Sequence, residues 1–90
     1  FCLKHLPGSE GEAEFLASTQ VLENLPGVEQ FQCLRQISNK NPYRFGLSMV
    51  FADETAYQGY NEHPDHLAFL KQRWLPEVEE FMEIDYQPLY

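Results

Sequence analysis

The fold is decided by two stretches in which apolar side chains alternate with others: VEQFQCLRQIS at residues 28–38 and RFGLSMVF at residues 44–51. Alternation with a period of two is typical of β-strands, because successive side chains of a strand point to opposite faces. The polar cluster NKNP at residues 39–42 is typical of a turn, so the two strands are predicted to pair as an antiparallel hairpin. The predicted inward side carries Phe31, Cys33, Arg35 and Ile37 in the first strand and Phe45, Leu47, Met49 and Phe51 in the second.

Before the hairpin, the sequence predicts a helix. SEGE at residues 9–12 has the form of a capping box, in which Ser9 accepts the N–H of Glu12 and Glu12 reaches back. Pro26-Gly27 ends the helix. Its apolar face, at helical spacing, consists of Phe15, Thr19, Leu22 and Leu25.

After the hairpin, two helical pieces are predicted. Asp53 can cap a short helix from Glu54 to about Tyr60, and Pro64 begins a second helix at its favoured first position. Pro76 is expected to kink or divide this second helix. The predicted apolar stripe consists of Leu67, Leu70, Trp74 and Val78.

Both ends of the chain resemble strands. Residues 1–4 read as the end of a strand whose beginning is missing, and residues 81–86 alternate Met82, Ile84 and Tyr86 with Glu83 and Asp85. The resulting order is β-α-β-β-α-β. We therefore predict one α+β domain over residues 1–90 with a ferredoxin-like fold, in which two helices cover one face of a four-stranded antiparallel sheet.

The uncovered face of this sheet predicts a partner. It carries a mixed set of side chains that includes Leu34, Val50 and Phe81. An exposed apolar patch on a sheet usually marks an interface, and a twofold dimer needs only one self-complementary surface. The expected partner is therefore a second copy of the chain, packed sheet to sheet as a homodimer.

Composition limits the other partners. The chain has 14 acidic and 6 basic residues, a formal charge of -8, so nucleic acid and anionic membranes are poor partners. No apolar run approaches the ~20 residues that span a bilayer. We expect a cytoplasmic protein, although a chain that starts at Phe1 does not exclude a signal peptide. Cys2 and Cys33 are expected to be reduced core residues.

The densest cluster of functional side chains is YNEHPDH at residues 60–66. It allows two interpretations. In one, Tyr60 and the histidines form an acid-base or ligand-binding pair, because imidazole titrates near neutrality and a phenol can orient an oxygen. In the other, the motif only begins a helix, with His63 as its cap and His66 in the core.

No metal and no cofactor are expected. Glu62, His63, Asp65 and His66 offer ligand atoms, but the histidines lack the i, i+4 spacing of a helical zinc pair and no further fixed ligand is evident. The sequence has no nucleophile elbow and no phosphate-binding glycine loop. The acidic run Glu77, Glu79 and Glu80 and the acidic start of the first helix are interpreted as solvated faces.

The chain resembles the stress-responsive A/B barrel (Dabb) domain family of the dimeric α+β barrel superfamily. The resemblance rests on the element order and on short segments spread over nearly the whole chain. These are Leu25-Pro26-Gly27-Val28, Phe51-Ala52-Asp53, residues 60–69, Trp74-Leu75-Pro76 and residues 81–86. It implies a ferredoxin-like protomer and a homodimer whose two sheets form a barrel.

Function follows less directly from this resemblance. It implies a small dimeric stress-response protein that binds a small hydrophobic or phenolic ligand in a pocket between helices and sheet without turnover. The first alternative is a polyketide-cyclase-like lyase, because in such enzymes a tyrosine and a histidine placed like Tyr60 and His66 line the pocket. The second is a cofactor-free or haem-linked monooxygenase, supported by fold analogy alone. Whether the chain is an enzyme is left open.

The predicted site lies on the second helix. His66, Phe69 and Arg73 fall at i, i+3 and i+7, so one helix face could present a base, an aromatic wall and a cation to a small ligand. With Tyr60 and His63 they form the predicted ligand-binding set. In an enzyme, His66 and Tyr60 would be the catalytic residues.

Overall fold

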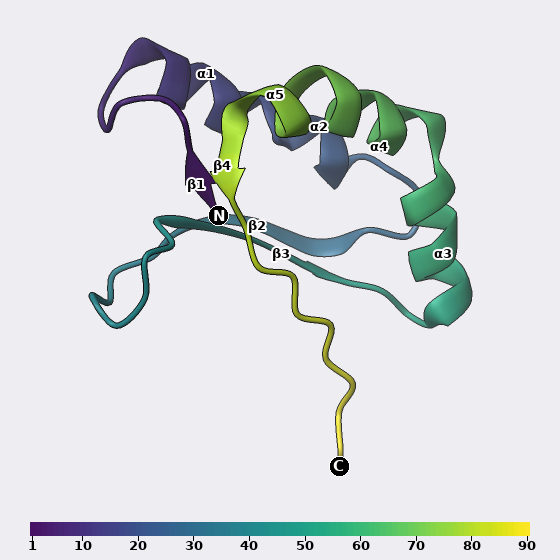
Figure 1. Cartoon of the computed structure of the whole chain (residues 1–90). Helices are drawn as coiled ribbons and strands as arrows, with labels where there is room; N and C mark the ends of the chain where they lie inside the picture. The colour runs from purple at the N-terminus through teal and green to yellow at the C-terminus, as the bar shows by residue number, and fades with distance from the viewer.

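Helices cover one face of paired strands in this computed structural model, which describes residues 1–90 (Figure 1). In chain order the elements are β1 (Cys2–Leu3), α1 (Glu10–Ser18), α2 (Gln20–Glu23), β2 (Glu29–Arg35), β3 (Phe45–Val50), α3 (Glu54–Glu62), α4 (Pro64–Phe69), the π-helical turn η1 (Leu70–Trp74), α5 (Leu75–Glu77) and β4 (Val78–Glu80). The predicted β-α-β-β-α-β order is confirmed, and the fold is α+β and ferredoxin-like.

The strands form two antiparallel pairs that meet at the first residue. β2 pairs with β3, and β1 pairs with β4. The Phe1 amino group donates to Phe45 O at 2.7 Å, and Phe45 N donates to Phe1 O at 3.1 Å. These reciprocal bonds place β1 beside β3. The predicted four-stranded sheet is therefore present as two ladders joined at Phe1, in the spatial order β4-β1-β3-β2.

The β2–β3 hairpin is shorter than its alternation predicted. The register shifts between Glu29 and Gln32, and Gln30 has a φ of 50°. Such a bulge adds an unpaired residue and bends the strand. Beyond it the register is regular, with Leu34 opposite Gly46 and Arg35 opposite Phe45.

The first predicted helix forms and is divided once. Ser9 Oγ accepts the N–H of Glu12, as the capping box predicts, whereas Glu12 Oε1 accepts the N–H of Gly8. The hydroxyls of Ser18 and Thr19 donate to the carbonyls of Phe15 and Leu16. Hydroxyls bonded in this way compete with the backbone ladder, which accounts for the break between α1 and α2.

The second helical region is bent by its proline. Asp53 caps α3 by accepting the N–H of Ala56 at 2.8 Å, as predicted. Pro76 has no N–H and its ring displaces the carbonyl four residues earlier. The chain adapts by widening the preceding turn, so that Leu75 N donates to Leu70 O in the i→i+5 pattern of η1. The predicted kink is thus a π-turn.

The core lies between the helices and the strands. The face of the first helix is buried as predicted, with Phe15 and Thr19 fully enclosed. The stripe predicted for the second helix is confirmed at Trp74 and Val78, which belong to or pack against the core, and Leu70 is half-buried. It is wrong at Leu67, which is 52% exposed, because α4 turns Phe69 inward in its place. The rings of Phe1, Phe15, Phe45, Phe69 and Trp74 form the centre of this core.

The last predicted strand is misplaced. β4 is Val78–Glu80, and residues 81–90 have no regular secondary structure and extend away from the rest of the molecule (Figure 1). β4 pairs with β1 through Glu80 opposite Cys2 and Val78 opposite Leu3.

Two smaller expectations concern the cysteines and the membrane. Both cysteines are free, as predicted. Cys2 is half-buried and donates to Pro42 O, but Cys33 is exposed, so its placement in the core was wrong. None of the helices has the length and apolar character needed to span a bilayer.

Candidate functional site

Tyr60 and His66 are in contact, as the acid-base interpretation of residues 60–66 requires. Tyr60 lies in the last turn of α3, and His66 lies near the start of α4. Their ring centroids are 4.4 Å apart. The bend at His63 between the two helices brings the rings together. Phe51 packs on the Tyr60 ring, with centroids 5.2 Å apart.

The hydrogen bonding of His66 defines its neutral form. Its Nδ1 lies 3.0 Å from the carbonyl oxygen of Asn61. A carbonyl oxygen can only accept, so Nδ1 carries the proton in the neutral ring and Nε2 keeps its lone pair. Nε2 has no hydrogen-bond partner within the chain. The half-buried imidazole therefore offers a free acceptor nitrogen.

Tyr60 is held in its neutral form. Its side chain is only 6% exposed, and burial, helped by the charges of Tyr57 and Glu83, raises the pKa of its phenol to about 12. Its hydroxyl makes no hydrogen bond within the chain, whereas the hydroxyl of neighbouring Tyr57 donates to Asp85 Oδ2 at 3.1 Å. Tyr60 can therefore act as a hydrogen-bond donor over the physiological pH range.

His63 has a structural role here. Its Nδ1 accepts the N–H of Asp65 at 3.0 Å, which makes it the N-cap of α4 ahead of Pro64. The helix-start interpretation is correct for this residue. His63 was expected to contact a ligand, but its ring caps α4 and does not pack on the Tyr60 ring.

Phe69 and Arg73 lie on the same side of the helix as His66, but their neighbours are different from those of His66. The Phe69 ring packs in the core, 6.0 Å from Phe15. Both residues border a shallow hollow of about 240 Å³ between the two helical regions, which Tyr60 and His66 do not line. The structure therefore places the five predicted residues in three different settings. Tyr60 and His66 are in contact, His63 caps α4, and Phe69 and Arg73 border the hollow of about 240 Å³.

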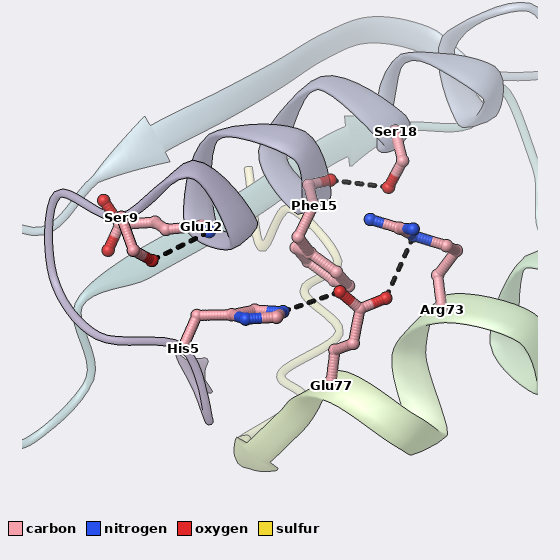
Figure 2. Close-up of polar contacts among 7 residues, drawn as sticks. All are labelled: His5, Ser9, Glu12, Phe15, Ser18, Arg73 and Glu77. Carbon is pink, nitrogen blue, oxygen red and sulfur yellow. Dashed lines mark hydrogen bonds and ion pairs between the residues drawn. The ribbon is translucent and has the colours of Figure 1, made fainter.

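Arg73 belongs to a polar cluster that also contains His5 and Glu77 (Figure 2). His5 Nε2 lies 2.7 Å from Glu77 Oε1. Arg73 Nε lies 3.0 Å from Glu77 Oε2, close enough for an ion pair but not aligned for a hydrogen bond. Figure 2 shows the two basic groups approaching one carboxylate from the loop after β1 and from η1.

This cluster corrects the interpretation of the acidic residues. The Glu77 side chain is 17% exposed and doubly paired, and Glu12 is buried against the Gly8 amide, so neither lies on a solvated face. A Cβ at Gly11 would lie 2.5 Å from His5 Nδ1, which leaves no room for a side chain there. The i, i+4 spacing of Arg73 and Glu77 was the signal available in the sequence. The cluster clamps the N-terminal loop to α5.

The structure contains no group of three or more histidine, cysteine or acidic side chains arranged to hold a metal ion. Another hollow, of about 280 Å³, lies at the turn of the β2–β3 hairpin, away from the hollow that Phe69 and Arg73 border. It is lined by Arg35, Gln36, Ser38, Asn41, Pro42, Tyr43 and Arg44. Two of the six basic residues of the chain therefore converge at this turn.

Comparisons of the sequence and the structure with known proteins identify one family and one similar solved structure. The stress responsive A/B barrel domain family matches residues 1–88. A crystal structure of a Dabb family protein with a ferredoxin-like fold, from Mesorhizobium loti MAFF303099, is 54% identical and superposes with a TM-score of 0.97. The similarity covers 100% of this chain and 91% of that one. A search of curated proteins gave no significant match.

Proposed function

The chain belongs to the stress-responsive A/B barrel domain family, and from that premise we propose that it is a homodimer that binds a small phenolic or hydrophobic ligand. The ligand contacts Tyr60 and His66 and is bound without turnover. The observation that supports this proposal is the contact between the Tyr60 and His66 rings, each of which has a polar atom, the hydroxyl and Nε2, without a hydrogen-bond partner in the chain.

Such a pair suits a ligand with both donor and acceptor groups. The Tyr60 hydroxyl can donate to a carbonyl or phenolic oxygen, and His66 Nε2 can accept a hydroxyl proton. The aromatic rings of Phe51 and Tyr57 lie next to Tyr60 and supply an apolar wall. A few polar groups in an aromatic setting are typical of small-molecule sites.

The exposed area supports the homodimer. The chain exposes 6792 Å², whereas a folded monomer of 10.5 kDa exposes about 5,400 Å². The excess, roughly 1,400 Å² per chain, is more than the ~800 Å² that each partner buries in a standard interface. Leu34 and Val50, on the strands, remain 43% and 44% exposed. A second copy would cover this surface.

A lyase of the polyketide-cyclase type is the second candidate, favoured by the same free nitrogen. His66 Nε2 would accept a proton from a carbon next to a carbonyl, and the Tyr60 hydroxyl would hydrogen-bond to the oxygen on which negative charge develops. The resulting enolate would attack a second carbonyl in the same molecule to form a ring, and the alkoxide left at that carbonyl would take the proton back from His66. His66 is then the base, and Tyr60 stabilises the anion.

Calorimetry with 4-hydroxyacetophenone, which carries a phenol and a carbonyl, tests the binding site. We expect His66→Ala and Tyr60→Phe each to weaken binding about tenfold, because each removes one hydrogen bond to the ligand. Tyr57→Phe and His63→Asn are the matched controls: the first hydroxyl already bonds Asp85, and asparagine can still cap α4. Equal affinity in all four variants would reject the site.

A further inference from the structure

The turn of the β2–β3 hairpin is basic in a chain that is otherwise strongly acidic. Residues 30–52 contain Arg35, Lys40 and Arg44, and all 14 acidic residues of the chain lie outside this stretch. Neither Arg35 nor Arg44 forms a salt bridge, because both salt bridges of the chain are made by Glu77 at the other side of the molecule's helices. Two arginines therefore lie close together without a negatively charged partner.

Both arginines line the hollow of about 280 Å³ at this turn. Apart from Pro42, the side chains that line it all carry a polar group. Its volume is near the lower end of the roughly 300–1,000 Å³ that is typical of ligand pockets. Such a hollow suits a small polar ligand, in contrast to the aromatic surroundings of Tyr60.

Hydrogen bonds within the turn hold the shape of the hollow. Gln36 Nε2 donates to Tyr43 O at 2.8 Å and to Asn41 Oδ1 at 3.2 Å. Asn41 Oδ1 also accepts the N–H of Tyr43 at 3.0 Å. Gln36 Oε1 accepts the N–H of Ser38, and Gln36 N donates to Arg44 O at 2.8 Å. The turn is thus organised without a ligand, which lowers the entropic cost of binding one.

These bonds occupy acceptor atoms and leave donor groups free. The amide oxygens of Gln36 and Asn41 already accept, and Ser38 Oγ accepts the N–H of Lys40 at 3.1 Å. The hydroxyls of Ser38 and Tyr43 and the NH2 group of Asn41 donate to no atom of the chain. Guanidinium groups can only donate. The free polar groups around the hollow are therefore donors, which is the requirement for binding an anion.

The charge of the arginines favours a phosphate group over a single carboxylate. The Arg35 Cζ lies 5.3 Å from the centroid of the Phe45 ring, a stacked contact that positions the guanidinium and leaves its N–H groups free. A phosphate group carries roughly -1.5 to -2 charge at pH 7 and three acceptor oxygens. A carboxylate carries one charge and two oxygens. Two guanidinium groups with several neutral donors match the phosphate better.

We infer that the hairpin turn is a second ligand site, which binds the phosphate group of a small compound through Arg35 and Arg44. Ser38 and Asn41 donate to the remaining phosphate oxygens. The turn lies at the end of the hairpin away from α3, which carries Tyr60 (Figure 1). The site is therefore separate from the proposed phenolic site and goes beyond that function.

NMR titration of the full, isotope-labelled chain tests the site. Backbone amide signals are followed while inorganic phosphate, glycerol 3-phosphate or acetate is added at constant pH and ionic strength. We expect both phosphates to give saturable shifts at residues 36–44, and acetate to bind at least about tenfold more weakly because it carries a single charge. Tighter binding of glycerol 3-phosphate would identify a phosphate ester as the ligand, and equal binding would identify free phosphate.

Variants of matched charge distinguish this site from general attraction of anions. Arg35→Gln and Arg44→Gln change exposed residues, so they should fold, and each should weaken phosphate binding at least about tenfold. Lys71→Gln removes the same charge at an exposed position of η1 and should leave binding unchanged, as should His66→Ala. Equal losses in Lys71→Gln and Arg44→Gln would overturn the inference. So would shifts with acetate as large as those with phosphate, or no saturable shift at residues 36–44.

Discussion

The helix-side core and residues 81–90, here called the C-terminal arm, both carry large apolar side chains but have opposite surroundings. In the core, the rings of Phe1, Phe15 and Trp74 lie within 6.3 Å of one another, centroid to centroid, and Phe15 is fully buried. In the arm, Tyr86 and Leu89 are 86% and 89% exposed. Apolar composition alone therefore does not say whether a segment stabilises its own fold. What decides it is whether the side chains are enclosed by others, as Phe15 is, or remain exposed, as Tyr86 does.

The strands explain this difference. The helices pack on one face of the strands only. Apolar side chains on that face are buried against the helices. The outer side chains Leu34 and Val50 remain 43% and 44% exposed. Core residues should consequently control the free energy of unfolding, and residues of the outer strand face should control association.

The largest effect is expected at Phe15. Phe15→Ala removes a fully buried ring that contacts Phe1, Phe69 and Trp74, and should lower the free energy of unfolding by about 3–5 kcal/mol. Urea denaturation followed by Trp74 fluorescence measures it. If Phe81→Ala, in the arm, lowers the free energy of unfolding as much as Phe15→Ala does, the contrast between core and arm is wrong.

A smaller effect, on the order of 2 kcal/mol, is expected from the ionisation of Tyr60. Above pH 10 the unfolded chain loses this phenolic proton, whereas the folded chain keeps it until the pKa of about 12. The contribution to stability is thus complete below pH 10 and is lost as the pH rises toward 12. Unfolding measured from pH 9 to 11.5 should show a steeper decline for wild type than for Tyr60→Phe. Parallel profiles would mean that Tyr60 is not enclosed.

Two glycines give a matched pair with effects of opposite sign. Gly11→Ala puts a Cβ against the His5 ring, which must then move away from Glu77, at a cost of about 1 kcal/mol. Gly59→Ala, on a helix with open space around it, should stabilise by about 0.5–1 kcal/mol. Thermal melts of both variants measure the difference. A stabilising Gly11→Ala would show that the His5–Glu77 clamp contributes nothing.

The smallest change in folding free energy is expected in the arm itself. Leu89→Ser alters an almost fully exposed side chain and should change the unfolding of a dilute sample by less than about 0.5 kcal/mol. The measurement is urea denaturation at the lowest concentration that fluorescence allows. A loss above ~2 kcal/mol would place Leu89 in a core and remove the contrast between the two regions.

The sequence predicted the fold wherever local chemistry and periodicity agreed. The Ser9 and Asp53 caps and the hairpin form as predicted, and the first helical region ends at Glu23, shortly before Pro26-Gly27. The predictions failed where a distant partner decides the outcome. Residues 81–86 alternate like a strand, but the last strand of the structure is Val78–Glu80. The burial of Phe69 in place of Leu67 goes with the bend at His63, where α4 starts in a new direction that the spacing of apolar residues does not indicate.

The candidate site was predictable in part. The contact of Tyr60 with His66 follows from the helix boundary at His63-Pro64, and the structure confirms that the two rings meet. The clamp of His5 on Glu77 joins residues 72 positions apart, so no local pattern indicates it. Whether the Tyr60–His66 pair binds a ligand stays a prediction.

Sedimentation velocity of the full chain over a micromolar concentration series tests the central claim, that the exposed strand face forms an interface between two copies. The account predicts one species of twice the 10.5 kDa chain mass, which shifts toward the monomer in Leu34→Glu/Val50→Glu and not in Leu6→Glu. A wild-type chain that sediments as a 10.5 kDa monomer at every concentration would contradict it.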